Sequence, residues 1–293
     1  MEPDPENGRA AVAVGLDGPS EGLAVEARAF LGERPVGGAR ARAGGRSVRL
    51  LLELGERRLW SPEEPTLFRL ELRLERGEEL VDRIQSWFGL RRLSIQGRAL
   101  LLNGRPLFQR LVLDQGFYPE GIWTAPSDAA LRRDIELARE AGFDGARLHQ
   151  KVFEPRFLHW ADRLGYLVWG EYPNWGLDHA RPAAQFEVLE EWGRILGRDR
   201  NHPALVGWCA FNETPASAGA LQRAAAALAR ALDPGRPVLE SSGWTHTLPD
   251  PELLDAHDYD QDPERFRGRW AARLGEGLAV PAQIGRASCR ERV

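Results

Sequence analysis

Polar and aromatic side chains follow a series of short apolar segments in the C-terminal two thirds of the chain. They are Asp114-Gln115, Arg147 with His149, Glu171 with Tyr172 and Trp175, Asn212-Glu213, Ser241-Ser242 with Trp244, and His257-Asp258-Tyr259. Carboxylates supply the acid, base or nucleophile that cleaves a glycosidic bond. Indole rings cover the apolar C–H faces of a pyranose and still offer an N–H group. The combination predicts a site for a sugar, with Trp175 and Trp244 as the sugar-facing rings.

Each candidate also has a purely structural interpretation. The position of Asn212-Glu213 directly after an apolar segment favours a functional role. The alternative is that Glu213 is a solvated loop or helix-start carboxylate. For Glu171 a structural role is equally open. Arg147 and His149 lie two apart on a predicted strand, so they share one face. Either both meet the ligand, or Arg147 belongs to a structural ion pair.

The segment His257–Tyr259 combines an imidazole, a carboxylate and a phenol, which suits either a metal or a hydrogen-bonding site. Since no further ligands cluster nearby in the sequence, the hydrogen-bonding interpretation of His257 and Tyr259 is preferred. The sequence contains no Gly-rich phosphate loop. We therefore predict neither a metal nor a cofactor.

These side chains can meet only if the segments before them are parallel strands. Helical and strand patterns alternate from Phe108 onward, which is typical of βαβ units. The predicted strands are Phe108–Leu113, Gly145–His149, Tyr166–Trp169, Ala204–Phe211, Pro237–Leu239 and Leu253–His257. A complete (β/α)₈ barrel takes about 250 residues and eight units. The pattern therefore predicts an incomplete TIM barrel of about six units.

The N-terminal part has a different period. Apolar and charged residues alternate from Leu23 to Phe88, most clearly between Phe68 and Leu74, and turn residues separate the runs. This predicts an immunoglobulin-like β-sandwich. We expect the sandwich at 1–95, the partial barrel at 96–284, and a non-native tail at 285–293.

Composition excludes several classes of protein. The 39 basic and 43 acidic residues give a net charge of -4 without a basic block, which argues against nucleic-acid binding. No apolar run approaches the roughly 20 residues of a membrane helix. The acidic, Pro-rich start, Met1–Glu6, does not resemble a secretory signal, so a cytoplasmic location is expected. Two cysteines, Cys209 and Cys289, exclude a disulfide framework.

Three runs in the first half of the chain resemble the sandwich-to-barrel passage of glycoside hydrolase family 2. They are Leu59–Phe68, Phe88–Arg91 and Leu102–Leu107. Two later runs, Ala161–Glu171 and Asn201–Trp208, are similar to the third and fourth barrel strands of that family, and Asn212-Glu213 follows them. The resemblance covers Gly55 to Arg269.

The resemblance implies a retaining, exo-acting enzyme for terminal β-linked sugars, since the family includes β-galactosidases, β-glucuronidases and β-mannosidases. It implies that Glu213 is the general acid/base and that Asn212 holds the sugar 2-hydroxyl. Arg147 matches the arginine that orients the nucleophile. The polar and aromatic residues His149, Glu171, Trp175, Trp244, His257 and Tyr259 are expected to contact the substrate.

The chain departs from the family pattern in three ways. The N-terminal jelly roll of the family has no counterpart before Met1. His149 lies two residues after Arg147, where many members place a histidine three residues after. The nucleophile is expected on a seventh strand shortly after Pro281, but the chain continues as Ile284–Val293, which resembles translated adapter DNA. We therefore expect a truncated, inactive fragment of a glycosidase.

Two alternatives from other classes remain open. A non-catalytic carbohydrate-binding protein would keep the aromatic site and bind a sugar without turnover. In the other, the sandwich is an interaction module that binds a protein partner through residues 1–95. The sequence does not specify the oligomeric state.

Overall fold

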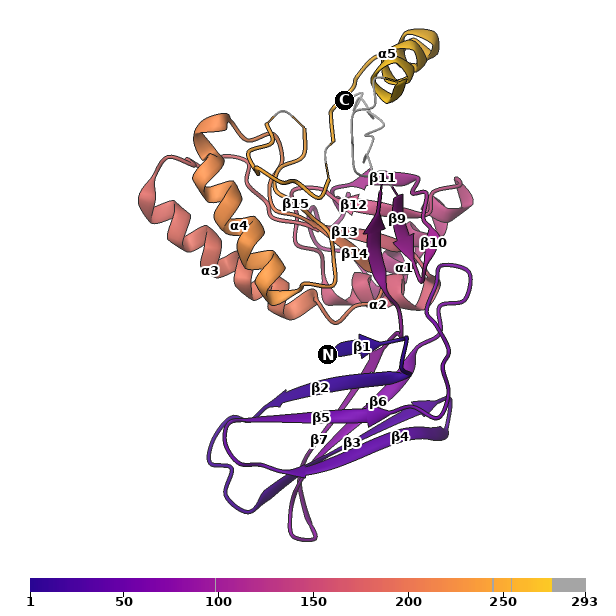
Figure 1. The fold of residues 1–293 in the computed structure, drawn as a ribbon, viewed down its shortest axis with the longest axis vertical. Coiled ribbons are helices and arrows are strands. Elements are labelled where there is room, and N and C mark those ends of the chain that lie inside the picture. The colour runs from indigo at the N-terminus through magenta and orange to yellow at the C-terminus, as the bar shows by residue number, and fades with distance from the viewer. Residues whose placement is uncertain (98, 244, 254, 276–293) are drawn as a thin grey trace. The chain divides into compact units, whose positions relative to one another are not determined.

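The computed structural model describes residues 1–97, 99–243, 245–253 and 255–275 (Figure 1). The chain divides into two compact units. The first comprises Met1–Arg92 together with Asn201–Pro203, and the second comprises Leu93–Arg200 and the chain from Ala204 onward.

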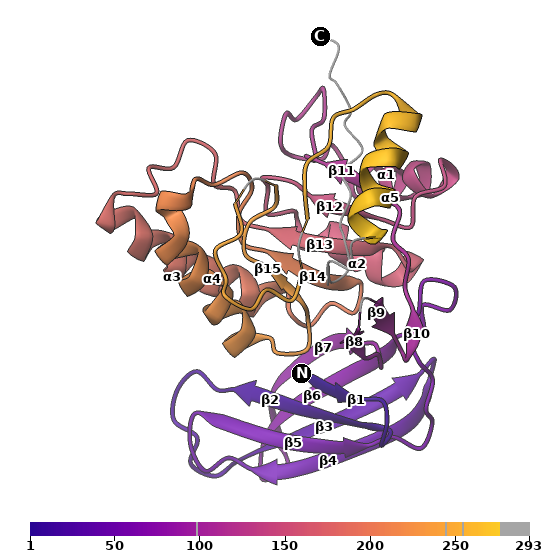
Figure 2. The ribbon, with the colours of Figure 1, turned by 45° about the horizontal axis from the view of Figure 1, so that its top comes forward.

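Two antiparallel sheets build the first unit (Figure 2). The larger sheet has the order β4-β3-β6-β7 and the smaller β1-β2-β5. Their bounds are β1 Glu2–Asp4, β2 Arg9–Gly15, β3 Leu23–Leu31, β4 Arg34–Arg42, β5 Ser47–Glu53, β6 Phe68–Arg76 and β7 Glu79–Phe88. Alternate side chains of both sheets, such as Val25 and Leu50, meet in one core, where Phe68 stacks on Phe88 with ring centroids 5.0 Å apart. The predicted sandwich is confirmed.

A short antiparallel sheet opens the second unit. It contains β8 Leu93–Gln96, β9 Ala99–Leu102 and β10 Arg105–Pro106. Asn103 and Gly104 form the turn between the last two strands, with φ of 53° and 78°. Positive φ at both central residues is the geometry that Asn-Gly favours in a two-residue hairpin.

A parallel sheet with the order β11-β12-β13-β14-β15 forms the body of the second unit. Its strands are β11 Leu111–Asp114, β12 Gly145–Leu148, β13 Leu167–Glu171, β14 Leu205–Cys209 and β15 Val238–Leu239. The helices are α1 Asp128–Glu140, α2 Pro155–Leu164, α3 Pro182–Asp199, the short 3-10 helix η1 Ala216–Ala218, α4 Gly219–Leu232 and α5 Pro263–Gly275. Figures 1 and 2 show α1 beside α2 and α3 beside α4 along the sheet. This arrangement is a partial TIM barrel.

Local chemistry sets the ends of these elements. The Ser127 hydroxyl accepts a hydrogen bond from Ala130 N at 3.1 Å and so caps α1. Helix α2 ends at Gly165, whose φ of 69° is left-handed. Within the sheet, Gly207 lies against the Trp169 ring, because a Cβ at this position would come within 2.3 Å of it. A side chain at position 207 would therefore push Trp169 out of the barrel core.

The prediction of a sixth strand at Leu253–His257 is wrong for the residues of this segment that the structure describes. Apart from a single bridge at Ala256, these residues form no strand. Asp255 instead accepts hydrogen bonds from Gly243 N and Ser242 Oγ, so side-chain bonds replace a strand ladder. None of the helices within the described ranges is long and apolar enough to cross a membrane.

Candidate active site

A buried ion pair lies at the carboxyl ends of β12 and β13. Arg147 Nε donates to Glu171 Oε2 at 2.6 Å, and Arg147 Nη2 donates to Asn212 Oδ1 at 2.8 Å. Burial raises the pKa of Glu171, and the Arg147 guanidinium opposes that rise. Although burial works against it, the Glu171 carboxylate raises the pKa of Arg147. The pair thus fixes the Asn212 amide from one side.

The buried Asn174 amide holds the backbone of Asn212 from the other side. Asn174 Oδ1 accepts from Asn212 N at 2.9 Å, and Asn174 Nδ2 donates to Asn212 O at 3.0 Å. Gln150 in turn holds Asn174, because Gln150 Nε2 donates to Asn174 Oδ1 at 2.7 Å. The charged Arg147 therefore fixes the side chain of Asn212, and the neutral Asn174 amide fixes its backbone.

Glu213 has a left-handed backbone with φ of 51°. This conformation costs an ordinary residue about 1 kcal/mol or more and is found where surrounding contacts enforce it, often at active sites. Here Glu213 N donates to Ser242 O at 2.8 Å, while Asn212 and Ser242 pair in a parallel bridge. The strand ends thus hold the Glu213 carboxylate on a strained turn.

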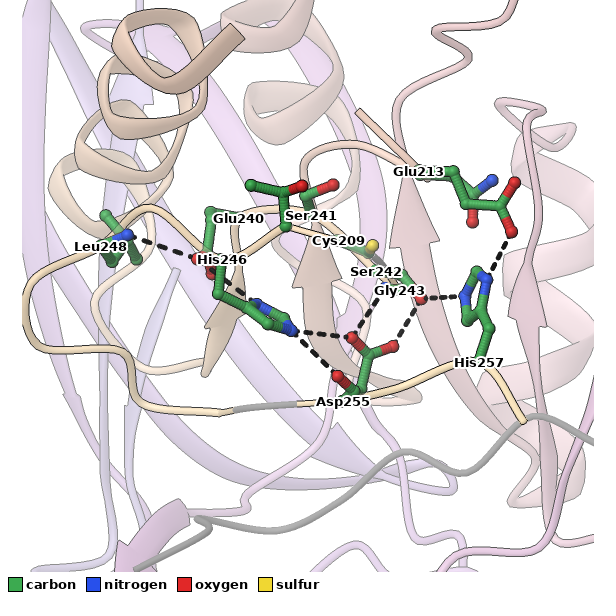
Figure 3. A network of polar contacts seen from close by, with 12 residues as sticks. Cys209, Glu213, Glu240, Ser241, Ser242, Gly243, His246, Leu248, Asp255 and His257 are labelled. Atoms are coloured by element: carbon green, nitrogen blue, oxygen red, sulfur yellow. Dashed lines mark hydrogen bonds and ion pairs between the residues drawn. The ribbon is translucent and has the colours of Figure 1, made fainter. Parts of the chain in front are cut away.

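A chain of polar contacts runs inward from Glu213 (Figure 3). His257 Nδ1 is hydrogen-bonded to Glu213 Oε1, and His257 Nε2 lies 2.9 Å from Ser242 Oγ. Ser242 Oγ donates to Asp255 Oδ2 at 2.5 Å. Tyr259 Oη lies 3.4 Å from Glu213 Oε1. Burial lowers the pKa of His257, which favours its neutral form.

At its inner end, this series of polar contacts reaches a histidine that lies between two carboxylates. His246 Nδ1 lies 3.4 Å from Glu240 Oε1, and its Nε2 lies 3.4 Å from Asp255 Oδ1. The contact with Asp255, followed by that with Glu240, raises the pKa of His246 from 6.5 to about 10. His246 is therefore an imidazolium at neutral pH and neutralises part of this acidic cluster.

We expect the free energy of unfolding to fall as the pH rises from 6.5 towards about 10. The folded-state pKa of His246 lies above its unfolded value. Its stabilising contribution is therefore complete below pH 6.5 and is lost as the pH passes through about 10. His246→Gln should flatten this slope in urea titrations across the range.

His179→Gln is the matched control for that experiment. Burial lowers the pKa of His179, so it stays neutral throughout the same range and its replacement should leave the slope unchanged. An equal slope in the original protein and in His246→Gln would show that His246 is not the titrating group.

His149 and Trp175 lie together at the strand ends. Their rings make an edge-to-face contact with centroids 5.0 Å apart, and Gln115 Nε2 lies 2.9 Å from His149 Nδ1. His149 is fully buried, whereas 60% of the Trp175 surface is exposed. The indole therefore contacts the buried His149 ring and still presents more than half of its surface to solvent.

The structure groups most of the site residues predicted from the sequence. One group contains Arg147, Glu171 and Asn212, a second contains Glu213, His257 and Tyr259, and a third contains His149 and Trp175. Glu171 is buried against Arg147. Trp244 lies outside the described residues.

Sequence reasoning missed the supporting residues Gln150, Asn174, His246 and Asp255. A usable signal existed for Asp255, because it lies two residues before His257 in a segment expected to be extended. Nothing in the sequence singles out the other three. Within the part of the chain that the structure describes, no three His, Cys, Asp or Glu side chains gather as a metal site requires.

Comparison with known proteins gives relatives for both units. The family described as "Glycosyl hydrolases family 2" matches residues 13–91, and its TIM barrel domain matches residues 94–257. "Beta-galactosidase 2" of Enterobacter cloacae is 31% identical over 198 residues, which cover 64% of this chain and 19% of that protein. A β-galactosidase of Yersinia pseudotuberculosis is 27% identical over 242 residues, covering 79% of this chain and 22% of the relative. The chain thus spans about a fifth of the length of these curated relatives.

Solved structures agree in fold. An FMN-binding β-glucuronidase from Facaelibacterium prausnitzii superposes with a TM-score of 0.83 at 19% identity, covering 96% of this chain and 46% of the other. A β-glucuronidase from Dictyoglomus thermophilum gives a TM-score of 0.79 at 20% identity, covering 95% and 51%. At these identities the likeness shows the fold alone. Since the barrel-domain match covers more than half of the sequence, the chain belongs to glycosyl hydrolase family 2.

Proposed function

We propose that this chain carries the proton-donating half of a retaining β-glycosidase site for terminal β-linked sugars such as β-galactosides. Glu213 is the general acid/base and Asn212 binds the sugar 2-hydroxyl. Arg147 positions Asn212, and His149, Trp175, His257 and Tyr259 complete the sugar site. The relatives named β-galactosidase support a galactoside as the first substrate to test.

The observation that carries the proposal is a buried donor on Asn212. Asn212 Oδ1 accepts from Arg147 Nη2, which fixes the orientation of the amide. Asn212 Nδ2 is buried and has no hydrogen-bond partner among the described residues. A buried donor without a partner costs about 1 to 3 kcal/mol. A sugar hydroxyl beside Glu213 would remove that cost, which gives the site a reason to bind a polyol.

Among the described residues, the buried carboxylates Glu171 and Asp255 are poor candidates for the second carboxylate of a retaining site, because both are already bonded. A retaining mechanism needs two carboxyl groups about 5 to 5.5 Å apart, one of them free to attack. Glu171 is bonded to Arg147 and to Gln150 N, and Asp255 is bonded to Ser242 and Gly243 N. We therefore expect the chain 1–293 to bind sugars but to hydrolyse them at the background rate.

Azide tests this proposal by acting as the attacking group. One azide nitrogen bonds to the anomeric carbon as the bond to the aryloxide oxygen breaks. A phenoxide leaving group takes the Glu213 proton, whereas dinitrophenolate departs as the anion. The expected product from dinitrophenyl β-galactoside is α-galactosyl azide, identified by NMR. A panel of β-glucuronides and β-mannosides measures sugar preference. Fast hydrolysis without azide would show that a second carboxylate is present, and absence of both binding and azidolysis would refute the function.

Replacing Trp175 by alanine is expected to weaken galactoside binding by about 2- to 10-fold, because the indole covers one apolar sugar face. Isothermal titration of phenyl thio-β-galactoside measures the effect. Phe108→Ala is the matched control, since Phe108 is 81% exposed and precedes β11 at the opposite end of the strand. Equal losses for both variants would remove Trp175 from the sugar site.

A further inference from the structure

Figure 3 shows the contacts that join Glu213 to Asp255 through His257 and Ser242, and with an ionised Asp255 and a neutral His257 these hydrogen bonds have only one consistent direction. Burial pushes the pKa of Asp255 up, but hydrogen bonds from His246, Ser242 and Gly243 N outweigh it and keep this pKa below its ordinary value. Asp255 is therefore a carboxylate, which can only accept hydrogen bonds. Its Oδ1 accepts from Gly243 N at 2.9 Å and its Oδ2 from Ser242 Oγ at 2.5 Å.

Ser242 has one hydroxyl proton, and it donates this proton in its hydrogen bond to Asp255. Towards His257 the Ser242 oxygen can then act only as an acceptor, so His257 Nε2, at 2.9 Å, must carry a proton. In neutral His257 the second ring nitrogen, Nδ1, then holds a lone pair. Nδ1 faces Glu213 Oε1. Two lone pairs repel at hydrogen-bonding distance, so the proton between them belongs to Glu213.

We infer that Ser242 and Asp255 set the tautomer of His257, whose Nδ1 accepts the acid proton of Glu213 in the unliganded protein, while His246 holds Asp255 from behind. Ser242, Asp255 and His246 are positioning residues, since each acts through His257. The inference rests on the proposed role of Glu213 and adds what keeps its proton in place before a sugar arrives.

Protons are conserved when this arrangement acts in the reaction. Glu213 gives its proton to the departing oxygen and becomes a carboxylate that faces the His257 lone pair. This arrangement is repulsive, so Glu213 takes a proton back from the solvent once the phenol and the glycosyl azide have left. His257 keeps its Nε2 proton throughout.

Burial has the largest effect on the pKa of His257, and it lowers this pKa although the charges around the ring act in both directions. Burial and the Arg147 charge disfavour the imidazolium, whereas Asp255 and Glu213 favour it. Tyr259 contacts the ring edge-on, with centroids 6.3 Å apart. The tautomer of His257 therefore depends on the direction of the Ser242 hydrogen bond, and a single substitution can reverse that direction.

Asp255→Asn is the substitution that should reverse the direction of the hydrogen bonds between residue 255 and Glu213. An amide has one acceptor oxygen, and Gly243 N, a backbone donor that cannot turn away, retains it. The amide NH₂ then faces Ser242 Oγ, and the Ser242 proton must turn towards His257 Nε2. His257 would shift its own proton to Nδ1 and donate to an ionised Glu213.

Nitrogen-15 NMR of histidine-labelled protein 1–293 reads this tautomer directly. The chain has six histidines, and His257→Gln identifies the signals of His257. Near neutral pH we expect a lone-pair nitrogen at Nδ1 and a protonated nitrogen at Nε2. Asp255→Asn should exchange these two signatures, whereas Ser242→Thr, which keeps the hydroxyl, should preserve the original pattern.

An imidazolium or an Nδ1-protonated ring in the unchanged protein would overturn the inference, and this measurement needs no variant to fold. An unchanged tautomer in a folded Asp255→Asn variant would overturn the role of Asp255. The spectra require no sugar. If the expected tautomer is found but no sugar binds, only the proposed function is contradicted. If a sugar binds but His257 has the other tautomer, only this inference is contradicted.

Discussion

Replacing Glu213 by glutamine is expected to slow azidolysis of phenyl β-galactoside by about 10²- to 10⁴-fold, the usual contribution of a positioned general acid. Phenoxide is a poor leaving group and needs a proton as the glycosidic bond breaks. Dinitrophenolate leaves without one, so the same variant should retain most of its rate on dinitrophenyl β-galactoside. The ratio of the two losses measures proton donation itself.

Glu190→Gln provides the control for this ratio. Glu190 is an exposed carboxylate on α3 that pairs with Arg194, and its replacement should leave both rates unchanged. Equal losses on the two substrates in Glu213→Gln would mean that Glu213 supports folding or sugar binding but does not donate the proton.

Breaking the buried pair of Arg147 and Glu171 is expected to have the largest effect on stability. Glu171→Gln leaves the Arg147 guanidinium buried without its countercharge, and removal of one partner of a buried pair costs about 3 to 5 kcal/mol. Both side chains are 5% exposed or less, so solvent provides little screening. Urea denaturation followed by tryptophan fluorescence measures the loss.

Two further variants separate the charge from the packing. The exposed pair of Arg194 and Glu190 gives the reference, because Glu190→Gln should change stability by less than about 0.5 kcal/mol. The double variant Arg147→Met with Glu171→Leu removes both charges together and should recover much of the stability lost in Glu171→Gln. A loss in Glu171→Gln as small as that in Glu190→Gln would show that the pair is not an essential buried contact.

The fold follows from the sequence where one face of an element is buried. Alternation in β6, Phe68–Arg76, and in β5, Ser47–Glu53, predicted two strands of the sandwich. The same reasoning failed over the segment 253–257. There, apolar residues suggested a strand, but the Asp255 carboxylate bonds with Gly243 N and Ser242 Oγ in place of a ladder. A pattern of apolar residues does not reveal a side chain that competes for backbone donors.

The candidate site could be predicted from the sequence where a residue's position after a strand places it at the sheet edge. Parallel strands place their carboxyl ends at one edge, and this rule selected Arg147, Asn212 and Glu213. His257 was selected by the same rule, but from a strand that the described residues do not form. The rule could not select Asn174, since that residue matters only through the hydrogen bonds it exchanges with Asn212 across two loops. Such contacts depend on loop geometry, which periodicity does not encode.

A crystal structure of chain 1–293 with phenyl thio-β-galactoside, which resists hydrolysis, tests the central claim most directly. The proposed site requires the sugar 2-hydroxyl to accept from Asn212 Nδ2 and the glycosidic sulfur to lie beside the Glu213 carboxyl. A galactoside bound elsewhere, with both Asn212 Nδ2 and Glu213 left without sugar contacts, would contradict the assignment of this edge of the sheet as the active site.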